Sequence, residues 1–84
     1  MEDQIRSLVQ RHGSLDIDVT TIDADADLYK AGLSSFASVQ LMLGLEDAFG
    51  IEFPESLLTR RSFASIAAIK ATVEKLVHEQ ETVK

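Results

Sequence analysis

Two adjacent serines stand where a long polar segment meets an apolar helical stretch, in the run Gly32-Leu33-Ser34-Ser35-Phe36. A serine directly before a helix commonly caps it by accepting a hydrogen bond from a free backbone N–H group, which stabilises the helix by about 1 kcal/mol. Two serines leave one hydroxyl for another task. A phosphate on a hydroxyl at a helix N-terminus would meet free N–H groups and the positive end of the helix dipole. From the residues alone, a plain cap and a site of phosphate chemistry both stay open.

Other residues that could do chemistry lack the spacing that their chemistry requires. Asp23-Ala24-Asp25-Ala26-Asp27 begins like a calcium-binding loop, but Leu28 and Ser34 stand where such a loop needs glycine and glutamate. His12 and His78 lie far apart in the sequence, near predicted helix ends, and there is no cysteine to act as a nucleophile or metal ligand. We therefore predict no catalytic centre and no metal site.

Charge and length narrow the range of partners. The 84 residues suit one domain, 1–84, in which residues 79–84 are predicted to form a frayed tail. Eight Lys and Arg against 14 Asp and Glu give a net charge of −6, which disfavours nucleic acid and anionic membranes as partners and favours basic protein surfaces.

The basic doublet Arg60-Arg61 is predicted to be a solvated pair. A cysteine-free acidic chain suits the cytoplasm, and we expect a monomer.

No targeting or membrane-spanning segment is predicted. The start of the chain, Met1–Gln4, is acidic and polar, unlike a signal peptide, and the most apolar stretch, Leu41–Leu45, is too short to cross a bilayer.

The elements that would position the serines are helices. Helical spacing of apolar residues predicts a first helix over about 2–12 and a last helix that begins after Ser62 or Ser65. The clearest helix begins at Ser34 or Ser35 and ends at Phe49, followed by Gly50. Pro54 opens a short helix. The predicted fold is therefore all-α, a bundle of three main helices and one short one.

The connection from about Ser14 to Ser34 is unusually long for a compact domain, which indicates function or unrecognised structure. Its apolar residues are expected to hold it across the helix ends: Leu15, Ile17, Val19, Ile22, Leu28, Tyr29 and Leu33.

The central helix is too apolar for a helix with one buried face. At about 100° per residue, Leu41, Met42, Leu45 and Phe49 share one side with Ser38, which should face the core. The opposite side carries Phe36 and Leu43 beside Gln40 and Asp47, which indicates a contact surface. Gly44 borders that side, at a cost of about 1 kcal/mol relative to alanine, so a close approach to its backbone is one interpretation. The alternative is that Phe36 folds over the loop and Gly44 is merely tolerated.

Taken together, these segments resemble the acyl carrier protein family along nearly the whole chain. The resemblance is carried by Asp27-Leu28-Tyr29, Gly32–Phe36, Val39–Met42, Leu45–Pro54 and Phe63–Ile69. It implies that the serine opening the second helix, Ser35 by position, carries 4′-phosphopantetheine through a phosphodiester. It also implies a carrier that is not itself an enzyme.

Departures from the family pattern indicate which branch is resembled. Ser34 stands where the family usually has aspartate, and Gln40 where fatty-acid carriers often have an acid. The run from Gly32 to Gln40 is most similar to small bacterial aminoacyl carrier proteins, which implies a small cargo such as glycine or alanine. A carrier of fatty-acid or polyketide chains and an unmodified helical interaction module remain as alternatives.

Two partners follow from this resemblance: a phosphopantetheinyl transferase, and an amino acid:carrier protein ligase that resembles a seryl-tRNA synthetase core. The residues expected to dock them surround the attachment point: Phe36, Val39, Gln40, Leu43, Gly44 and Asp47.

Overall fold

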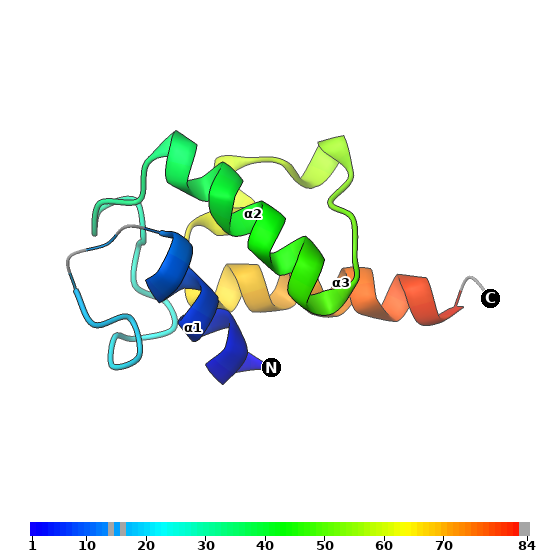
Figure 1. Cartoon of the computed structure of the whole chain (residues 1–84), viewed down its shortest axis with the longest axis horizontal. Coiled ribbons are helices and arrows are strands. Elements are labelled where there is room, and N and C mark those ends of the chain that lie inside the picture. Colours follow the sequence, from blue (N-terminus) through cyan, green and yellow to red (C-terminus); the bar gives the residue numbers. More distant parts are fainter. Residues whose placement is uncertain (14, 16, 83–84) are drawn as a thin grey trace.

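The computed structural model describes residues 1–13, 15 and 17–82, and within this part the regular elements are all helical. The three α-helices are α1 (Glu2–His12), α2 (Ser35–Phe49) and α3 (Ile66–Thr82), and two short 3₁₀ helices, η1 (Glu55–Leu57) and η2 (Arg60–Phe63), lie between α2 and α3 (Figure 1). The all-α prediction is confirmed, and α1 has the bounds expected from the sequence. None of the described helices is long and apolar enough to cross a membrane.

Two details differ from the sequence-based expectation. The single short helix is divided in two, because Leu58 leaves helical geometry and Thr59 is extended and caps the next turn. The described part of the predicted frayed tail, residues 79–82, continues α3, whose C-terminal turns project beyond the rest of the bundle (Figure 1).

The start of α3 agrees with the expectation. The hydroxyl of Ser65, one of the two predicted caps, accepts a hydrogen bond from the Ala68 N–H at 3.0 Å.

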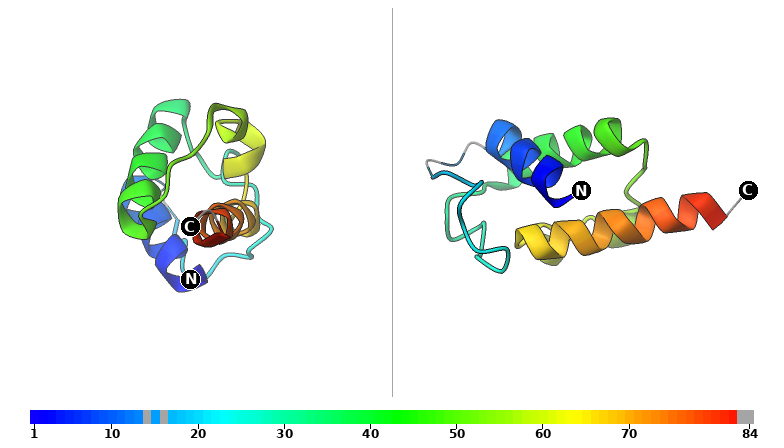
Figure 2. Two further views of the ribbon diagram at one scale, coloured as in Figure 1. Left: turned by 90° about the vertical axis from the view of Figure 1, so that its right-hand side faces the viewer. Right: turned by 90° about the horizontal axis from the view of Figure 1, so that it is seen from below.

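The core lies where the three helices meet. Viewed along the long axis, α2 lies between α1 and the η1–η2 segment, and α3 closes the bundle (Figure 2). Each helix contributes residues with no exposed surface: Ile5 and Val9 from α1, Leu41 and Leu45 from α2, and Ile66, Ile69 and Val73 from α3. This matches the apolar spacing on which the sequence prediction rests.

The long connection between α1 and α2 belongs to the core. Leu15, Val19, Leu28 and Leu33 are buried with the helix residues, and Ile17 is exposed. The expectation that this segment is held by its apolar residues is thereby confirmed for four of them. The segment is therefore a structural element without regular secondary structure.

Polar contacts fasten this segment to α1. Arg6, only 9% exposed, donates from Nη1 to the carbonyl oxygens of Val19 at 2.9 Å and Ile22 at 2.7 Å. Its Nε donates to the Glu2 carboxylate at 3.2 Å, and the Gln10 side chain accepts from the Val19 N–H at 2.8 Å. Arg6 is thus a clamp that satisfies carbonyl groups which a loop passing over a core would otherwise leave unpaired.

The same segment is fastened to the start of α3 by backbone bonds. The Ala24 carbonyl accepts from the Ala67 N–H at 2.9 Å, in the first turn of α3, and the Leu28 N–H donates to the Ala64 carbonyl at 2.7 Å. Free N–H groups at a helix N-terminus need partners, and here the loop supplies one.

Three aspartates of the segment form turns. Carboxylates of Asp18, Asp23 and Asp27 accept from backbone N–H groups two residues further along. The Thr20 hydroxyl, together with the Thr20 N–H, lowers the pKa of Asp18. Within the described residues, no group of three acidic or histidine side chains could hold a metal ion. Asp23 and Asp27, in the acidic run that begins like a calcium loop, therefore form Asx turns.

Replacing Arg6 with Met should lower the free energy of unfolding by about 2–3 kcal/mol, because two carbonyl oxygens lose a charged donor. Urea unfolding followed by circular dichroism measures the change. Arg11→Met removes an exposed arginine from the same helix and should cost less than about 0.5 kcal/mol. Equal losses in the two variants would show that the clamp adds nothing.

Candidate functional site

The two serines at the start of α2 have different roles. Ser34 is the N-cap: its backbone is extended, and its Oγ accepts from the Ala37 N–H at 3.0 Å. Ser35 is the first helical residue and is exposed. Its carbonyl accepts from the Ser38 hydroxyl at 2.8 Å, but its own Oγ takes part in no hydrogen bond found within the described residues. Ser35 therefore offers a hydroxyl with no structural task.

Local backbone geometry brings this hydroxyl to the surface. Gly32 has φ +117°, a backbone conformation that residues other than glycine rarely adopt. This conformation turns the chain toward α2. Leu33 is buried, and its N–H donates to the Leu28 carbonyl at 2.9 Å. The loop is thus anchored directly before the serines. No acidic residue lies in the first turn of α2, so its positive dipole end is not neutralised there.

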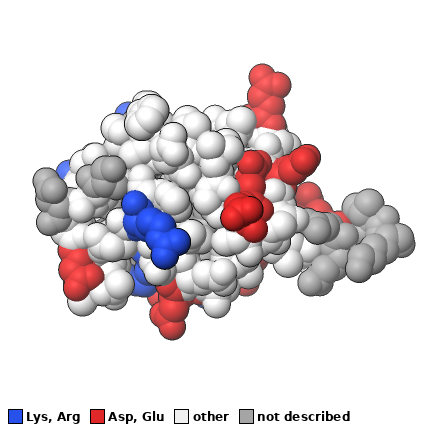
Figure 3. Space-filling model, in the orientation of Figure 1, with Lys and Arg blue, Asp and Glu red and all other residues white. Residues whose placement is uncertain are grey.

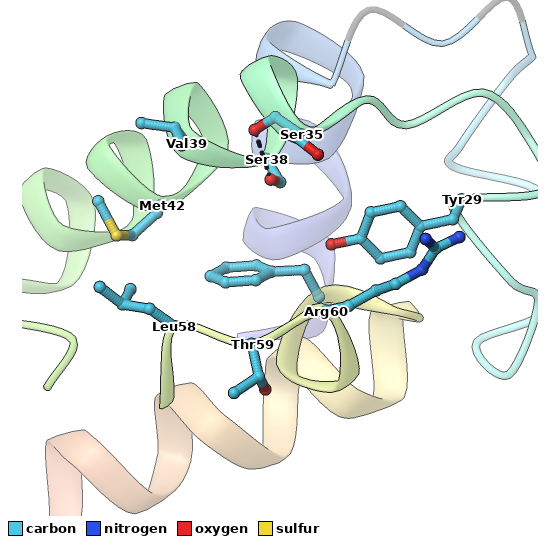
Figure 4. A pocket seen from close by; sticks show the side chains of 9 residues that line it. Tyr29, Ser35, Ser38, Val39, Met42, Leu58, Thr59 and Arg60 are labelled. Atoms are coloured by element: carbon cyan, nitrogen blue, oxygen red, sulfur yellow. Dashed lines mark hydrogen bonds between the residues drawn. The ribbon is translucent and has the colours of Figure 1, made fainter. Parts of the chain in front are cut away.

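A groove lies between α2 and the segment that contains Leu58 and η2, and Ser35 is one of its lining residues (Figure 4). Its volume is about 460 Å³, within the range of small-molecule sites. One wall is α2, and the other comes from the segment that contains Leu58 and η2. The lining residues are Tyr29, Ser35, Ser38, Val39, Met42, Leu58, Thr59, Arg60 and Phe63.

One end of the groove carries a cation. The Arg60 guanidinium carbon lies 4.3 Å from the centroid of the Tyr29 ring, a cation–π contact. Sequence analysis predicted that Arg60 and Arg61 form a solvated pair. Both are exposed, but Arg60 is also fixed against an aromatic ring and lines the groove, which that prediction missed. No local signal indicates this contact, because Tyr29 and Arg60 lie on separate elements.

The outward side of α2 is apolar. Phe36 is 74% exposed, and Val39 and Leu43 are each 50% exposed. Gln40 and Asp47 on the same side are exposed as well. The stripe predicted from helical spacing therefore exists, and the alternative in which Phe36 folds over the loop is wrong. We call Phe36, Val39 and Leu43 the apolar stripe.

Acidic side chains border this surface at one end. Figure 3 shows acidic groups gathered near the C-terminal end of α2 on the face where α1 and α2 lie in front, a basic group over α1, and uncharged surface between them. Glu46 at this end is half-buried, and its carboxylate accepts from the Phe53 N–H at 2.8 Å. The Glu46 carboxylate is thereby engaged by the turn that follows α2, whereas Asp47 is exposed.

Gly44, which the sequence places with the docking residues, lies against α1. A Cβ built on it would come within 2.7 Å of His12 Cδ2 and 2.9 Å of His12 Nε2. The close approach inferred for Gly44 therefore comes from the chain's own histidine at the end of α1. The glycine lets α1 and α2 approach, and its part in docking stays a prediction.

The chain is similar to known carrier proteins over nearly its whole length. The family model described as phosphopantetheine attachment site matches residues 3–76. An aminoacyl carrier protein of Agrobacterium fabrum is 57% identical over 81 residues, which cover 96% of this chain and 98% of that protein.

Solved structures agree in fold. One is a carrier protein from Agrobacterium tumefaciens complexed with an engineered Bradyrhizobium japonicum glycine:carrier protein ligase and AMP. It is 61% identical, with a TM-score of 0.85 and coverage of 88% of this chain and 99% of that one. A solution structure of an Agrobacterium tumefaciens protein, 56% identical, has a TM-score of 0.75 and covers 98% of this chain and 99% of that one.

The contact between His12 and Gly44 should appear as coupling between two substitutions. Alanine is about 1 kcal/mol better than glycine within a helix, but in Gly44→Ala the new methyl group must displace the imidazole. We expect Gly44→Ala to stabilise by about 1 kcal/mol in a His12→Ala background and by clearly less in the wild type. Urea unfolding of the four proteins gives the coupling. The same gain in both backgrounds would contradict the packing argument.

Proposed function

The chain belongs to the phosphopantetheine attachment-site family, and we propose that it is an aminoacyl carrier protein that bears its 4′-phosphopantetheine arm on Ser35. The observation that carries this assignment is the free Ser35 hydroxyl at the exposed start of α2, beside a groove. Members of this family are carriers rather than enzymes. When bound, the group supplies a thiol on a flexible arm that holds the amino acid as a thioester.

Ser35 is the better acceptor because Ser34 is already engaged. The Ser34 Oγ caps α2, and modifying it would remove the bond to the Ala37 N–H. The Ser35 hydroxyl forms no such bond within the described part of the chain, and it lies at the unneutralised positive end of the helix, which favours a phosphodiester. The residues present therefore fit the group.

The attachment step requires a phosphopantetheinyl transferase. The Ser35 oxygen attacks the pyrophosphate of coenzyme A at the phosphorus that bears pantetheine. The serine O–P bond forms, a pyrophosphate P–O bond breaks, the serine proton is lost to a base on the transferase, and adenosine bisphosphate leaves. This chain contributes the exposed Ser35 hydroxyl and its position at the start of α2.

The second partner is an amino acid:carrier protein ligase. A similar carrier is complexed with an engineered glycine:carrier protein ligase, which supports a small amino acid, glycine or alanine, as cargo here. We assign docking to the exposed side of α2, where the apolar stripe lies next to Gln40 and Asp47. The stripe is small, as expected for a complex that must form and dissociate in each cycle.

Substituting the two serines separately tests the attachment site. Ser35→Ala should abolish phosphopantetheinylation and amino-acid loading with little loss of stability, since Ser34 still caps α2. Ser34→Ala should keep the modification and lose about 1 kcal/mol of stability. Intact mass after incubation with coenzyme A and a broad transferase, together with urea unfolding, gives both results.

The pattern of failure is informative. Modification lost only from Ser34→Ala would move the site by one residue. An unmodified wild type would favour a helical interaction module, and a modified protein that accepts acyl chains but no amino acid from any ligase would favour a fatty-acid or polyketide carrier.

Truncating the apolar stripe tests the docking surface. Phe36→Ala and Leu43→Ala should raise the KM of the ligase for the carrier, while unfolding free energies stay within about 0.5 kcal/mol of wild type. Ile17→Ala is the matched control, because Ile17 is an exposed apolar residue of the connecting segment and is not part of α2. Loss of folding in either stripe variant, or an equal loss of charging in the control, would reject the assignment.

A further inference from the structure

We propose that Arg60, held over the Tyr29 ring, is a positioning residue that pairs with the phosphodiester on Ser35 and so fixes where the arm leaves the protein. This inference rests on the proposed attachment at Ser35 and adds a second residue to that site. Arg60 has no role in the attachment step described above, and it is not part of the apolar stripe.

The fold places the two side chains in one groove. Ser35 comes from the first turn of α2 and Arg60 from η2, and both line the same cavity. In Figure 4 the Ser35 side chain points toward the end of the groove where Tyr29 lies, and the Arg60 guanidinium lies over the Tyr29 ring. A phosphate on the Ser35 oxygen would extend from α2 toward this end.

Arg60 is held in place without a carboxylate partner. The chain has 14 acidic residues, yet neither of the two ion pairs found in the described part includes Arg60. Its support is the Tyr29 ring at 4.3 Å. The Tyr29 backbone is fixed in turn, since its N–H donates to the Asp27 carboxylate at 2.9 Å and its carbonyl accepts from the Gly32 N–H at 3.2 Å, and the half-buried side chain packs against the core.

The chemistry of both groups fits this pairing. A guanidinium presents a planar set of N–H donors that matches two oxygens of a phosphate, and stacking on an aromatic ring leaves its edge free to donate. The acid-free first turn of α2 adds N–H groups and the helix dipole on the other side of the same phosphate. The phosphodiester would thus lie between α2 and Arg60.

The pairing gives the arm a direction. With its phosphate held at the polar end of the groove, the arm starts next to the apolar wall formed by Val39, Met42 and Leu58. Lysine at position 60 would keep the charge but lose the planar donor set, so it should keep only part of the effect.

The test compares the arm-bearing forms of wild type, Arg60→Gln, Arg60→Lys and the control Arg61→Gln. Arg61 is an exposed neighbour in η2 that does not line the groove. Phosphorus NMR relaxation should show a more mobile phosphodiester in Arg60→Gln, an intermediate one in Arg60→Lys and an unchanged one in Arg61→Gln. In nitrogen–proton spectra, adding the arm should shift the Arg60 side-chain Nε–Hε signal and leave that of Arg61 in place.

The outcomes separate the two proposals. If intact mass shows no arm on the wild type, the proposed function fails. If the arm attaches to all four proteins but phosphate mobility and the Arg60 signal do not respond, the pairing is wrong while the function stands. If Arg60→Gln slows only charging by the ligase, Arg60 contacts the partner, which also overturns the proposal. Amide spectra of the unmodified variants check that each one is folded. If Arg60→Gln does not fold, the comparison of phosphate mobility is made between wild type and Arg60→Lys.

Discussion

The hydrogen bonds that fasten the long connection to α1 and α3 decide where the functional groups of this chain lie. Arg6 and Gln10 hold its first half, and Ala24 and Leu28 join its second half to the start of α3. A segment without regular structure can cross a core only if its backbone groups have such partners. Because the path is fixed in this way, Leu33 enters the core and Ser35 emerges at the surface beside Tyr29.

The composition of α2 reflects two different demands on one helix. Leu41 and Leu45 face the core and have no exposed surface, whereas Phe36 and Leu43 face outward. A helix that served the core alone would place charged or polar side chains on its outer face. The excess of apolar residues therefore supports the proposed partner surface. Of the two adjacent serines at the N-terminus, Ser34 caps the helix and Ser35 is left for the proposed attachment.

Local patterns in the sequence predict the helices, because apolar spacing and capping residues act within a few turns. The bounds of α1 follow from such patterns. For α2 they leave either Ser34 or Ser35 as the cap and two positions for Phe36, and the structure decides both, with Ser34 as the cap and Phe36 exposed. The groove does not, because Tyr29, Val39 and Arg60 come from three elements whose approach depends on the path of the connection. Gly44 shows the same limit: its spacing indicates a close approach, but only the fold identifies His12 as the neighbour. Spacing alone leaves open which serine is modified, and the proposal of Ser35 rests on the resemblance along the chain together with the capping role of Ser34.

An exposed charge pair suits a carrier because it is weak. Pairs at a protein surface contribute about 0.2–1 kcal/mol, which corresponds to a bias of at most about fivefold between the held and free positions of the arm. Such a bias sets a preferred starting direction for the arm, and a partner that offers its own contacts to the phosphate or the arm can overcome it. A buried pair would hold the arm too firmly for delivery, since breaking it would leave an uncompensated charge. The position of Arg60, stacked on Tyr29 but open to solvent, gives direction to the arm and still allows its release.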